Sequence, residues 1–230
     1  MQTAAPIRRT SLKDHVVEYI RDAILSGRLE PGDRIVELKL ARELQIGTTA
    51  VREALFELEA LGFVTRVINK GTFITKLTPE DVDQIFRVRH ELEGLAAQLV
   101  FERIETADLS ELEKYASDMS TAAEQANPSE FYRADLEFHR ALWSLSGNRH
   151  LAKALDQIVV PLFTFFIMKT SRESKADLLK GVERHFELIQ CLKRRENPRD
   201  RFAEAIVFFS QQERQILFNQ PSGSGSSAAS

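Results

Sequence analysis

The segment Thr48-Thr49-Ala50-Val51-Arg52-Glu53-Ala54-Leu55, inside the longer stretch Leu44 to Gly62, decides the fold of the first third of the chain. Apolar residues recur here at helical spacing, at Val51, Ala54, Leu55, Leu58 and Leu61. Thr48 or Thr49 is predicted to cap this helix. Before it, Gln45-Ile46-Gly47 forms a turn, and Leu38, Ala41 and Leu44 give a second short helix an inward face. Two short helices joined by a tight turn form a helix-turn-helix.

The flanking sequence completes a winged version of this motif. Ser11 and Asp14 form a capping box for a first helix, which ends at Gly27. After the central helix, the β-prone runs 63–67 and 72–75 flank a turn that contains Gly71, a pattern typical of a hairpin. We therefore predict a winged helix-turn-helix over residues 11–76, preceded by a flexible tail at residues 1–10.

This layout predicts recognition of duplex DNA. The hydroxyls of Thr48 and Thr49 can bond phosphates or base edges, and Arg52 can bond a phosphate or a guanine edge. At the tip of the wing, Lys70 offers a phosphate contact and Gly71 lets the backbone approach closely. Alternatively, Arg52 belongs to a solvated helix face and Lys70 is an ordinary turn lysine.

Residues 11–76 resemble the winged helix-turn-helix of the GntR family of bacterial transcription regulators. The matching segments are Ile24–Asp33, Glu37–Ala41, Val51–Leu55 and Leu61–Val64. The resemblance implies that Thr48, Thr49, Arg52 and the wing contact DNA. The family usually has Ser-Arg or Thr-Arg where this chain has Gly47-Thr48, so one arginine contact is missing. Arg34, Lys39 and Arg42 are candidates to compensate for it.

From residue 78 onward the pattern is helical. Caps at Thr78, Thr106, Asn127 and Asn148 help to predict six helices, at 79–103, 107–126, 128–146, 149–170, 173–195 and 198–219. The fold class is therefore mainly α: the winged head followed by an all-α six-helix bundle at 78–219. The Gly/Ser/Ala-rich residues 220–230 are a disordered tail.

Polar residues on inward faces of this bundle suggest a ligand site. Asp135 and His139 are four residues apart, on one face of a helix, and His185 lies among apolar residues of another. A carboxylate and two imidazoles suit Zn, Ni or a similar divalent ion. Spacing alone does not establish a metal site, because a surface hydrogen bond between Asp135 and His139 and a core role for His185 are the more common arrangements.

The body resembles the FCD ligand-binding domain of the FadR-type branch of the same family. The matching segments are Arg89–Glu93, Asp135–Leu142, Ser146–Asn148 and Glu183–His185. The resemblance implies a divalent metal held by an Asp and three His, beside a small carboxylate effector. Asp135, His139 and His185 match the first three ligands. Phe209 occupies the place of the fourth.

The same resemblance places Arg89 in the effector pocket, where its guanidinium would bind a carboxylate. The alternative for Arg89 is a structural salt bridge to Glu93, four residues further along the helix. Arg133 and Asn148 are weaker candidates for effector contacts, and Asn148 is also expected to cap a helix.

Charge and composition set the remaining expectations. Residues 1–76 carry 12 Lys and Arg against 10 Asp and Glu, whereas the rest carries 19 against 24. A mildly basic head on an acidic body permits DNA binding at the head. One cysteine rules out a disulfide within the chain. The longest apolar run, Ile158 to Met168, is too short for a membrane span, so we expect a cytoplasmic protein without a membrane partner.

We interpret the chain as a homodimeric, ligand-responsive transcription regulator and not an enzyme. Each head would bind half of an operator, and a small organic acid in the body would modulate binding, with release of a repressor as the expected polarity. The alternative is a metal-dependent hydrolase or lyase in the body, with the head as a docking module.

Overall fold

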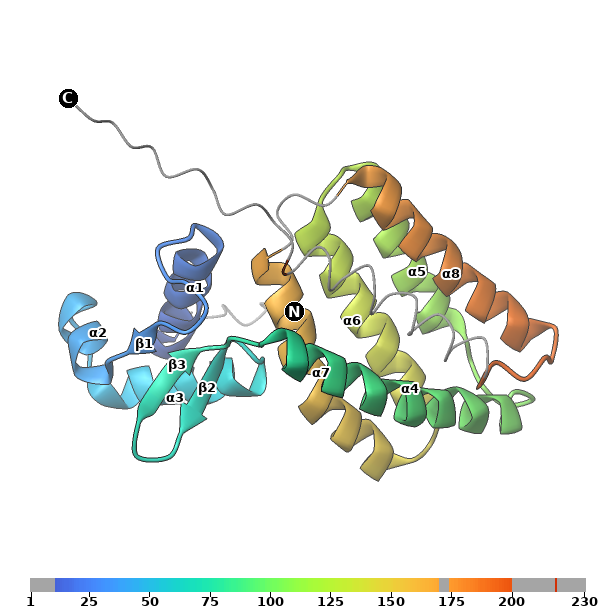
Figure 1. Cartoon of the computed structure of the whole chain (residues 1–230), viewed down its shortest axis with the longest axis horizontal. Helices are drawn as coiled ribbons and strands as arrows, with labels where there is room; N and C mark the ends of the chain where they lie inside the picture. Colours follow the sequence, from blue (N-terminus) through green and yellow to red (C-terminus); the bar gives the residue numbers. More distant parts are fainter. Residues whose placement is uncertain (1–10, 170–173, 200–217, 219–230) are drawn as a thin grey trace, which may run out of the picture. The chain divides into compact units, whose positions relative to one another are not determined.

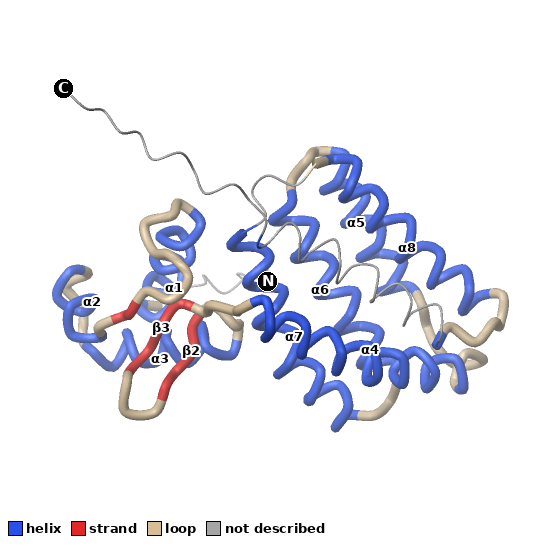
Figure 2. The backbone as a smooth tube through the Cα atoms, viewed as in Figure 1, coloured by secondary structure: helices blue, strands red, loops and turns tan. Residues whose placement is uncertain are grey.

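The computed structural model describes residues 11–169, 174–199 and 218 of the 230-residue chain. The chain forms two compact units that divide between Lys76 and Leu77, which we call the head and the body. Both units are mainly helical, and strands occur in the head (Figures 1 and 2). This confirms the predicted fold class, a winged helix-turn-helix followed by a helical domain.

The head contains three helices and a small sheet. Its elements are α1 (Leu12–Leu25), β1 (Arg34–Ile35), α2 (Glu37–Glu43), α3 (Thr48–Ala60), β2 (Val64–Val67) and β3 (Gly71–Ile74). Ser11 and Asp14 form the predicted capping box at the start of α1. The apolar face of α3 packs on α1 and α2, and Val51, Ala54, Leu55 and Leu58 are fully buried. The central helix therefore organises the core of the head.

The wing contains a strand that the sequence analysis missed. The sheet has the antiparallel order β1-β3-β2, and β1 pairs Arg34 with Phe73. A strand of two residues is too short to show an alternating pattern. Its pairing is extended by the preceding turn, where Gly32 N donates to Ile74 O and Ile74 N donates to Asp33 O. The hairpin is thus fixed to the segment between α1 and α2.

Two details of the helix-turn-helix differ from the prediction. In α2 the buried residues are Leu40 and Ala41, whereas Leu38 is 52% exposed. Leu38 and Leu40 are about 200° apart around a helix, so they cannot face α3 together. The cap of α3 is Gly47 in an extended conformation, and Thr48 is the first helical residue. The prediction that Thr48 or Thr49 caps α3 is therefore wrong.

The described part of the body holds five long helices. They are α4 (Pro79–Glu102), α5 (Ser110–Glu124), α6 (Pro128–Leu145), α7 (Arg149–Lys169) and α8 (Lys175–Lys193). Thr78 and Asn127 cap α4 and α6 as predicted, and Asn148 accepts from two backbone N–H groups at the start of α7. Thr106 does not cap α5, because it donates to Arg103 O in the turn that ends α4. The sixth predicted helix, 198–219, falls largely outside the described residues.

Helix α7 is more apolar than the sequence analysis allowed. Among the described residues it is the one helix long and apolar enough, by composition, to cross a membrane. The short run from Ile158 to Met168 is extended toward the N-terminus by the apolar residues of 151–155. Half of this apolar window is buried inside the body, where Phe163, Phe165 and Phe166 belong to the core. Its apolar character therefore serves the packing of the bundle.

Candidate functional site

The exposed face of α3 carries the predicted DNA-contacting residues. Thr49 and Arg52 lie on this face, and the Arg52 side chain is 63% exposed. Arg52 does not extend freely into solvent, because its Nε donates to Glu37 Oε2 at 2.6 Å. Glu37 is the first residue of α2, so the ion pair bridges the two helices of the motif. The guanidinium that is predicted to contact DNA is therefore the same exposed group that forms a surface ion pair in this structure.

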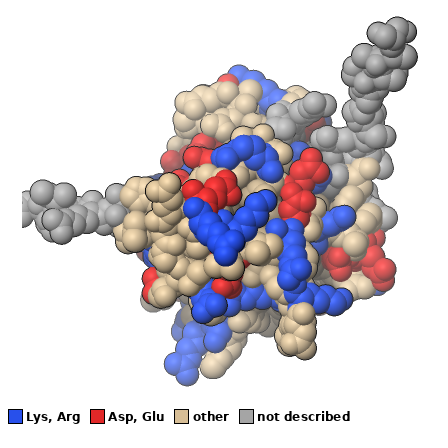
Figure 3. Space-filling view, turned by 90° about the vertical axis from the view of Figure 1, so that its left-hand side faces the viewer, with Lys and Arg blue, Asp and Glu red and all other residues tan. Residues whose placement is uncertain are grey.

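The wing tip presents a second set of predicted residues. Lys70 is exposed, and Gly71 has a φ of +115°. A Cβ atom at Gly71 would lie 3.2 Å from Arg34 Nε, so the guanidinium of Arg34 lies over this glycine. Lys39, on α2, is also exposed. Figure 3, in which the left-hand side of Figure 1 faces the viewer, shows Lys and Arg side chains gathered with acidic side chains among them.

Sequence analysis missed a contact that ties the wing to α3. The guanidinium of Arg66, on β2, lies 3.6 Å from the centre of the Phe56 ring. Arg66 Nε also lies 3.2 Å from Glu59 Oε2. Phe56 is 58% exposed, on the same side of α3 as Arg52. No spacing rule indicates such a pair, because its two members come from different elements.

In the body, the structure brings the three predicted metal ligands together. Asp135 and His139 come from α6, and His185 comes from α8. Asp135 Oδ1 lies 3.3 Å from His139 Nε2 and 3.0 Å from His185 Nε2. All three side chains are buried, and their candidate ligand atoms lie within 4.8 Å of one another. This excludes a surface hydrogen bond for the pair on α6.

The outer nitrogens of both histidines are held by partners. His139 Nδ1 lies 3.0 Å from Glu93 Oε1, and His185 Nδ1 donates to Gly181 O at 2.8 Å. Each ring therefore directs Nε2 toward Asp135. Metal-binding histidines commonly donate their second N–H to a carboxylate or a carbonyl in this way. The donor set and its orientation fit a divalent ion.

Gly181, on α8, lies against a side chain of α6. A Cβ atom at Gly181 would lie 2.8 Å from Phe131 Cζ, on α6. The ring of Phe138 then packs edge-on against the His185 ring, with their centres 4.6 Å apart. Gly181 thus leaves room for the Phe131 ring of α6, and its carbonyl orients a candidate ligand.

The charges around the cluster shift its protonation equilibria. Burial opposes ionisation of Asp135, but His185 and His139 more than offset it and hold the pKa of this carboxyl below its usual range. Burial likewise opposes protonation of His139, yet the carboxylates of Glu93 and Asp135 raise the pKa of His139 to about 9. Without a metal, a proton on His139 therefore helps to balance the negative charges of Glu93 and Asp135.

Arg89 and Glu93 extend this network on α4. Arg89 is 4% exposed, and its Nε donates to Glu93 Oε2 at 3.1 Å. Arg89 Nη2 also lies 3.5 Å from His139 Nε2, the atom that faces the cluster. Glu93 Oε1 accepts from Trp143 Nε1 at 3.0 Å. The salt bridge to Glu93 is thus present, and it holds Arg89 beside the candidate metal site.

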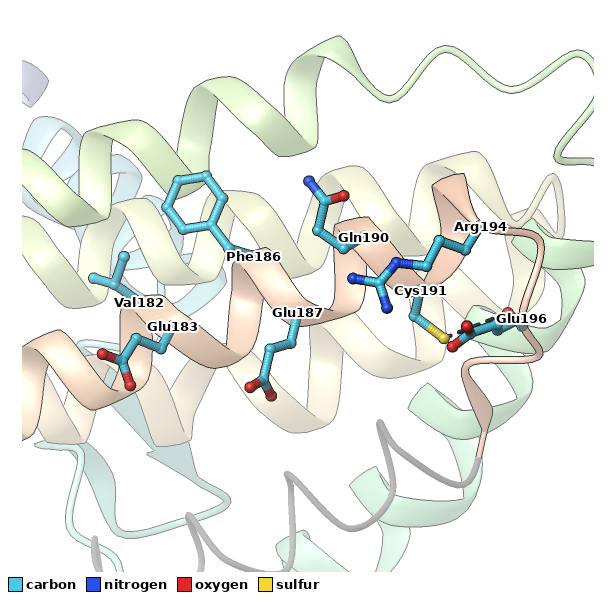
Figure 4. Close-up of a pocket in the computed structure, with 8 residues that line it drawn as sticks. All are labelled: Val182, Glu183, Phe186, Glu187, Gln190, Cys191, Arg194 and Glu196. Carbon is cyan, nitrogen blue, oxygen red and sulfur yellow. Dashed lines mark hydrogen bonds between the residues drawn. The ribbon is translucent and has the colours of Figure 1, made fainter.

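Other predicted body residues lie elsewhere. Arg133 is exposed and pairs with Glu130 at 3.0 Å, and Asn148 caps α7. Their role in effector binding stays a prediction, and Phe209 lies outside the described residues. An open groove of about 470 Å³ lies on the outer face of α8, beside Phe186 and Arg194 (Figure 4). None of the three clustered residues lines this groove, because His185 faces the core.

The head and the body each match a known sequence family. The family described as bacterial regulatory proteins, gntR family, matches residues 12–74, and the FCD domain matches residues 84–205. The HTH-type transcriptional regulator YdhC of Bacillus subtilis is 31% identical over 173 residues, which cover 74% of this chain and 77% of that protein. The gluconate operon transcriptional repressor of Bacillus licheniformis is 26% identical, covering 81% and 78%.

A solved structure agrees along almost the whole chain. The structure of McbR/YncC from Escherichia coli matches with a TM-score of 0.68 and 25% identity, covering 92% of this chain and 99% of that one. These relatives are transcription regulators, which supports that interpretation over the enzyme alternative. The chain therefore belongs to the GntR family of DNA-binding bacterial transcription regulators, with an FCD domain as its body.

Proposed function

We propose that this regulator is a cytoplasmic, homodimeric repressor whose body binds a divalent metal and a small organic acid. The observation that carries this proposal is the buried group of Asp135, His139 and His185, in which both histidines direct Nε2 toward one carboxylate. Buried clusters of ionisable side chains with shifted pKa values are common at functional sites in proteins. The FCD family supports it, because metal binding is common in these domains.

In this proposal the three side chains hold the metal and surrounding residues orient them. Glu93 and Gly181 O fix the tautomers of His139 and His185, so each presents a lone pair on Nε2. Metal binding would then release the proton that the His139 ring carries without it. Three protein ligands leave at least one coordination position for water or an effector oxygen.

Arg89 is proposed to hold the carboxylate of the effector. It is buried, positively charged and 3.5 Å from His139 Nε2, so an acid bound to the metal would lie within its reach. Glu93 binds the guanidinium through Nε, and the terminal Nη2 lies beside His139 Nε2, which faces the proposed metal position. A carboxylate is therefore the functional group that this site favours.

The head is proposed to bind operator DNA through α3 and the wing. Thr48, Thr49 and Arg52 would meet the major groove, with Arg52 exchanging Glu37 for a phosphate or a base edge. Lys70, Gly71 and Arg34 would contact the backbone from the wing, and Lys39 from α2. Effector binding would alter operator affinity by a coupling free energy of about 1–3 kcal/mol.

Metal analysis of the purified protein tests the body. After loading with Zn or Ni and extensive dialysis, we expect elemental mass spectrometry to find about one equivalent of metal per chain. His139→Gln should lose it, whereas His150→Gln, an exposed histidine on α7, should retain it. Equal metal contents in the two variants would show that the cluster is a core polar network instead.

A further inference from the structure

The guanidinium that is predicted to contact DNA already binds a carboxylate of the head. Arg52 Nε donates to Glu37 Oε2 at 2.6 Å, and the two side chains are 63% and 33% exposed. Glu37 begins α2 and Arg52 lies on α3, so this pair joins the two helices of the motif. An exposed ion pair contributes little to the stability of a fold. Its main consequence therefore concerns what else Arg52 can bind.

The other basic residues that are predicted to contact DNA lack such a partner. Among the residues that the structure describes, no carboxylate lies within ion-pair distance of Arg34, Lys39 or Lys70. All three of these residues are exposed, so they can bind phosphates directly. Arg52 differs from them, because a phosphate that approaches its guanidinium also approaches the carboxylate of Glu37.

A contact between Arg52 and a phosphate gains little while Glu37 is present. One phosphate contact lowers log K by about 0.9 for each tenfold rise in salt, which is roughly 8-fold in affinity at 0.1 M relative to 1 M. If Arg52 leaves Glu37 to make this contact, the lost ion pair removes up to about 5-fold. If Arg52 keeps Glu37, the carboxylate lies close to the phosphate, and two like charges about 4 Å apart in water repel by a factor of about 5. Either way, most of the gain is cancelled.

A guanine edge differs from a phosphate because it carries no net charge. Glu37 binds Nε of Arg52, and within the described part of the chain the terminal nitrogens Nη1 and Nη2 have no hydrogen-bond partner. A bidentate contact of an arginine with guanine O6 and N7 discriminates against a wrong base by roughly 5- to 150-fold. Such an edge does not repel the carboxylate of Glu37. The ion pair therefore weakens contacts of Arg52 with phosphates more than its contact with guanine.

From these observations we infer that Glu37 is a specificity-determining residue, which prevents Arg52 from binding phosphates and leaves it available for a guanine in the major groove. The inference rests on the proposed contact of Arg52 with operator DNA, and it selects the base edge over the phosphate. Glu37 acts through Arg52, so it is a positioning residue. Loss of its charge should raise the affinity for unrelated DNA more than the affinity for the correct sequence.

Fluorescence anisotropy with full-length Glu37→Gln tests this inference. The two probes are the duplex that the wild-type protein selects from a random pool and a duplex of the same composition with that sequence scrambled. At 0.1 M salt we expect Glu37→Gln to bind the scrambled duplex about 3-fold more tightly for each head in contact, with a salt slope steeper by up to about 0.9, and the selected duplex to change less.

Glu53→Gln is the matched control for the loss of one negative charge. Glu53 is exposed, is adjacent to Arg52 on α3 and forms no ion pair with any residue that the structure describes. Its replacement should leave the salt slope on the scrambled duplex unchanged. An equal rise in slope in Glu37→Gln and Glu53→Gln would overturn the inference, because the effect would then be one of net charge.

A double-mutant cycle shows whether the effect passes through Arg52. On the scrambled duplex, Arg52→Ala should cancel the gain that Glu37→Gln brings. A gain that persists without Arg52, or a scrambled duplex that Glu37→Gln binds no more tightly, would overturn the inference. The proposed contact of Arg52 with DNA would still stand if Arg52→Ala weakened binding to the selected duplex, and it would fail if that affinity were unchanged.

A modified base identifies the group that Arg52 contacts. Replacing a guanine of the selected duplex by 7-deazaguanine removes the N7 acceptor from the major groove. At one guanine or more, we expect this replacement to weaken binding by the wild-type protein by about 3-fold or more and to have no effect on Arg52→Ala. If no guanine shows this dependence on Arg52, the assignment of Arg52 to a guanine edge is refuted.

Discussion

Replacement of Glu93 by alanine should destabilise the body more than any change of an exposed charge on α4. Glu93 is fully buried, and its carboxylate accepts from Arg89 Nε at 3.1 Å and from Trp143 Nε1 at 3.0 Å. His139 Nδ1 lies 3.0 Å from the same carboxylate. Glu93→Ala would leave the Arg89 charge and two ring N–H groups buried without their acceptor.

The expected cost follows from these three contacts. A hydrogen bond that involves a charged group contributes about 1.5–3 kcal/mol and a neutral one about 0.5–1.5 kcal/mol. Removing one partner of a buried ion pair costs about 3–5 kcal/mol, because the remaining charge stays desolvated. We therefore expect Glu93→Ala to lower the free energy of unfolding of the body by about 3–5 kcal/mol, a large part of the total of about 5–15 kcal/mol for a domain.

Urea unfolding followed by tryptophan fluorescence measures this loss. Trp143 is the one tryptophan in the chain and is 1% exposed within the body, so the transition reports the body alone. Glu91→Ala is the matched control, because that side chain is 70% exposed on the same helix. Its effect should stay within about 0.5 kcal/mol.

A double variant separates the charge from the volume that the side chain fills. In Arg89→Met with Glu93→Leu, both buried charges are replaced by apolar groups of similar size, a change that is often tolerated. This protein should be more stable than Glu93→Ala alone. If Glu93→Ala costs less than about 1 kcal/mol, or if the double variant is the less stable of the two, the reasoning about the buried pair is wrong.

Three further outcomes are expected. In metal-free protein, the stability contributed by the raised pKa of His139 should be complete below pH 6.5 and decline as the pH rises through about 9; urea midpoints across this range should fall, and should fall less in His139→Gln. Arg52→Ala should weaken operator binding by about 1–3 kcal/mol in fluorescence anisotropy, whereas Glu18→Ala, an exposed acid on α1, should leave it unchanged; equal affinities would remove Arg52 from the interface. Thr78→Ala should lower the stability of the body by about 1 kcal/mol, since Thr78 Oγ1 accepts from Asp81 N in the capping box of α4, and an unchanged urea midpoint would contradict this.

Much of the fold could be predicted because local signals coincide with the elements. Ser11, Thr78 and Asn127 each begin a helix as their capping chemistry predicts. The strand β1 could not be predicted, since two residues carry no pattern and their pairing with β3 comes from residues about forty positions later. The inward face of α2 was wrong at Leu38 because a seven-residue helix allows more than one phase.

The residues of the candidate site could be predicted more completely than the contacts between them. The spacing of Asp135 and His139 predicts a shared face, and the family resemblance adds His185 to the set. The structure places His185 Nε2, on a different helix, 3.0 Å from Asp135 Oδ1. The salt bridge of Arg89 with Glu93 was one of two alternatives, and the structure shows it directly beside His139. The contact of Glu93 with Trp143 joins residues fifty positions apart, which no local pattern records.

The absence of a side chain at position 181 links the packing of α8 with the orientation of His185. Gly181 leaves space for Phe131, and its carbonyl oxygen orients His185. A descendant with alanine there would have to displace the Phe131 ring or move α8 away from α6, and in the second case His185 would move with it. Under the proposed function, such a change would impair ligand sensing before folding, and a lineage would keep a constitutive regulator in place of a responsive one.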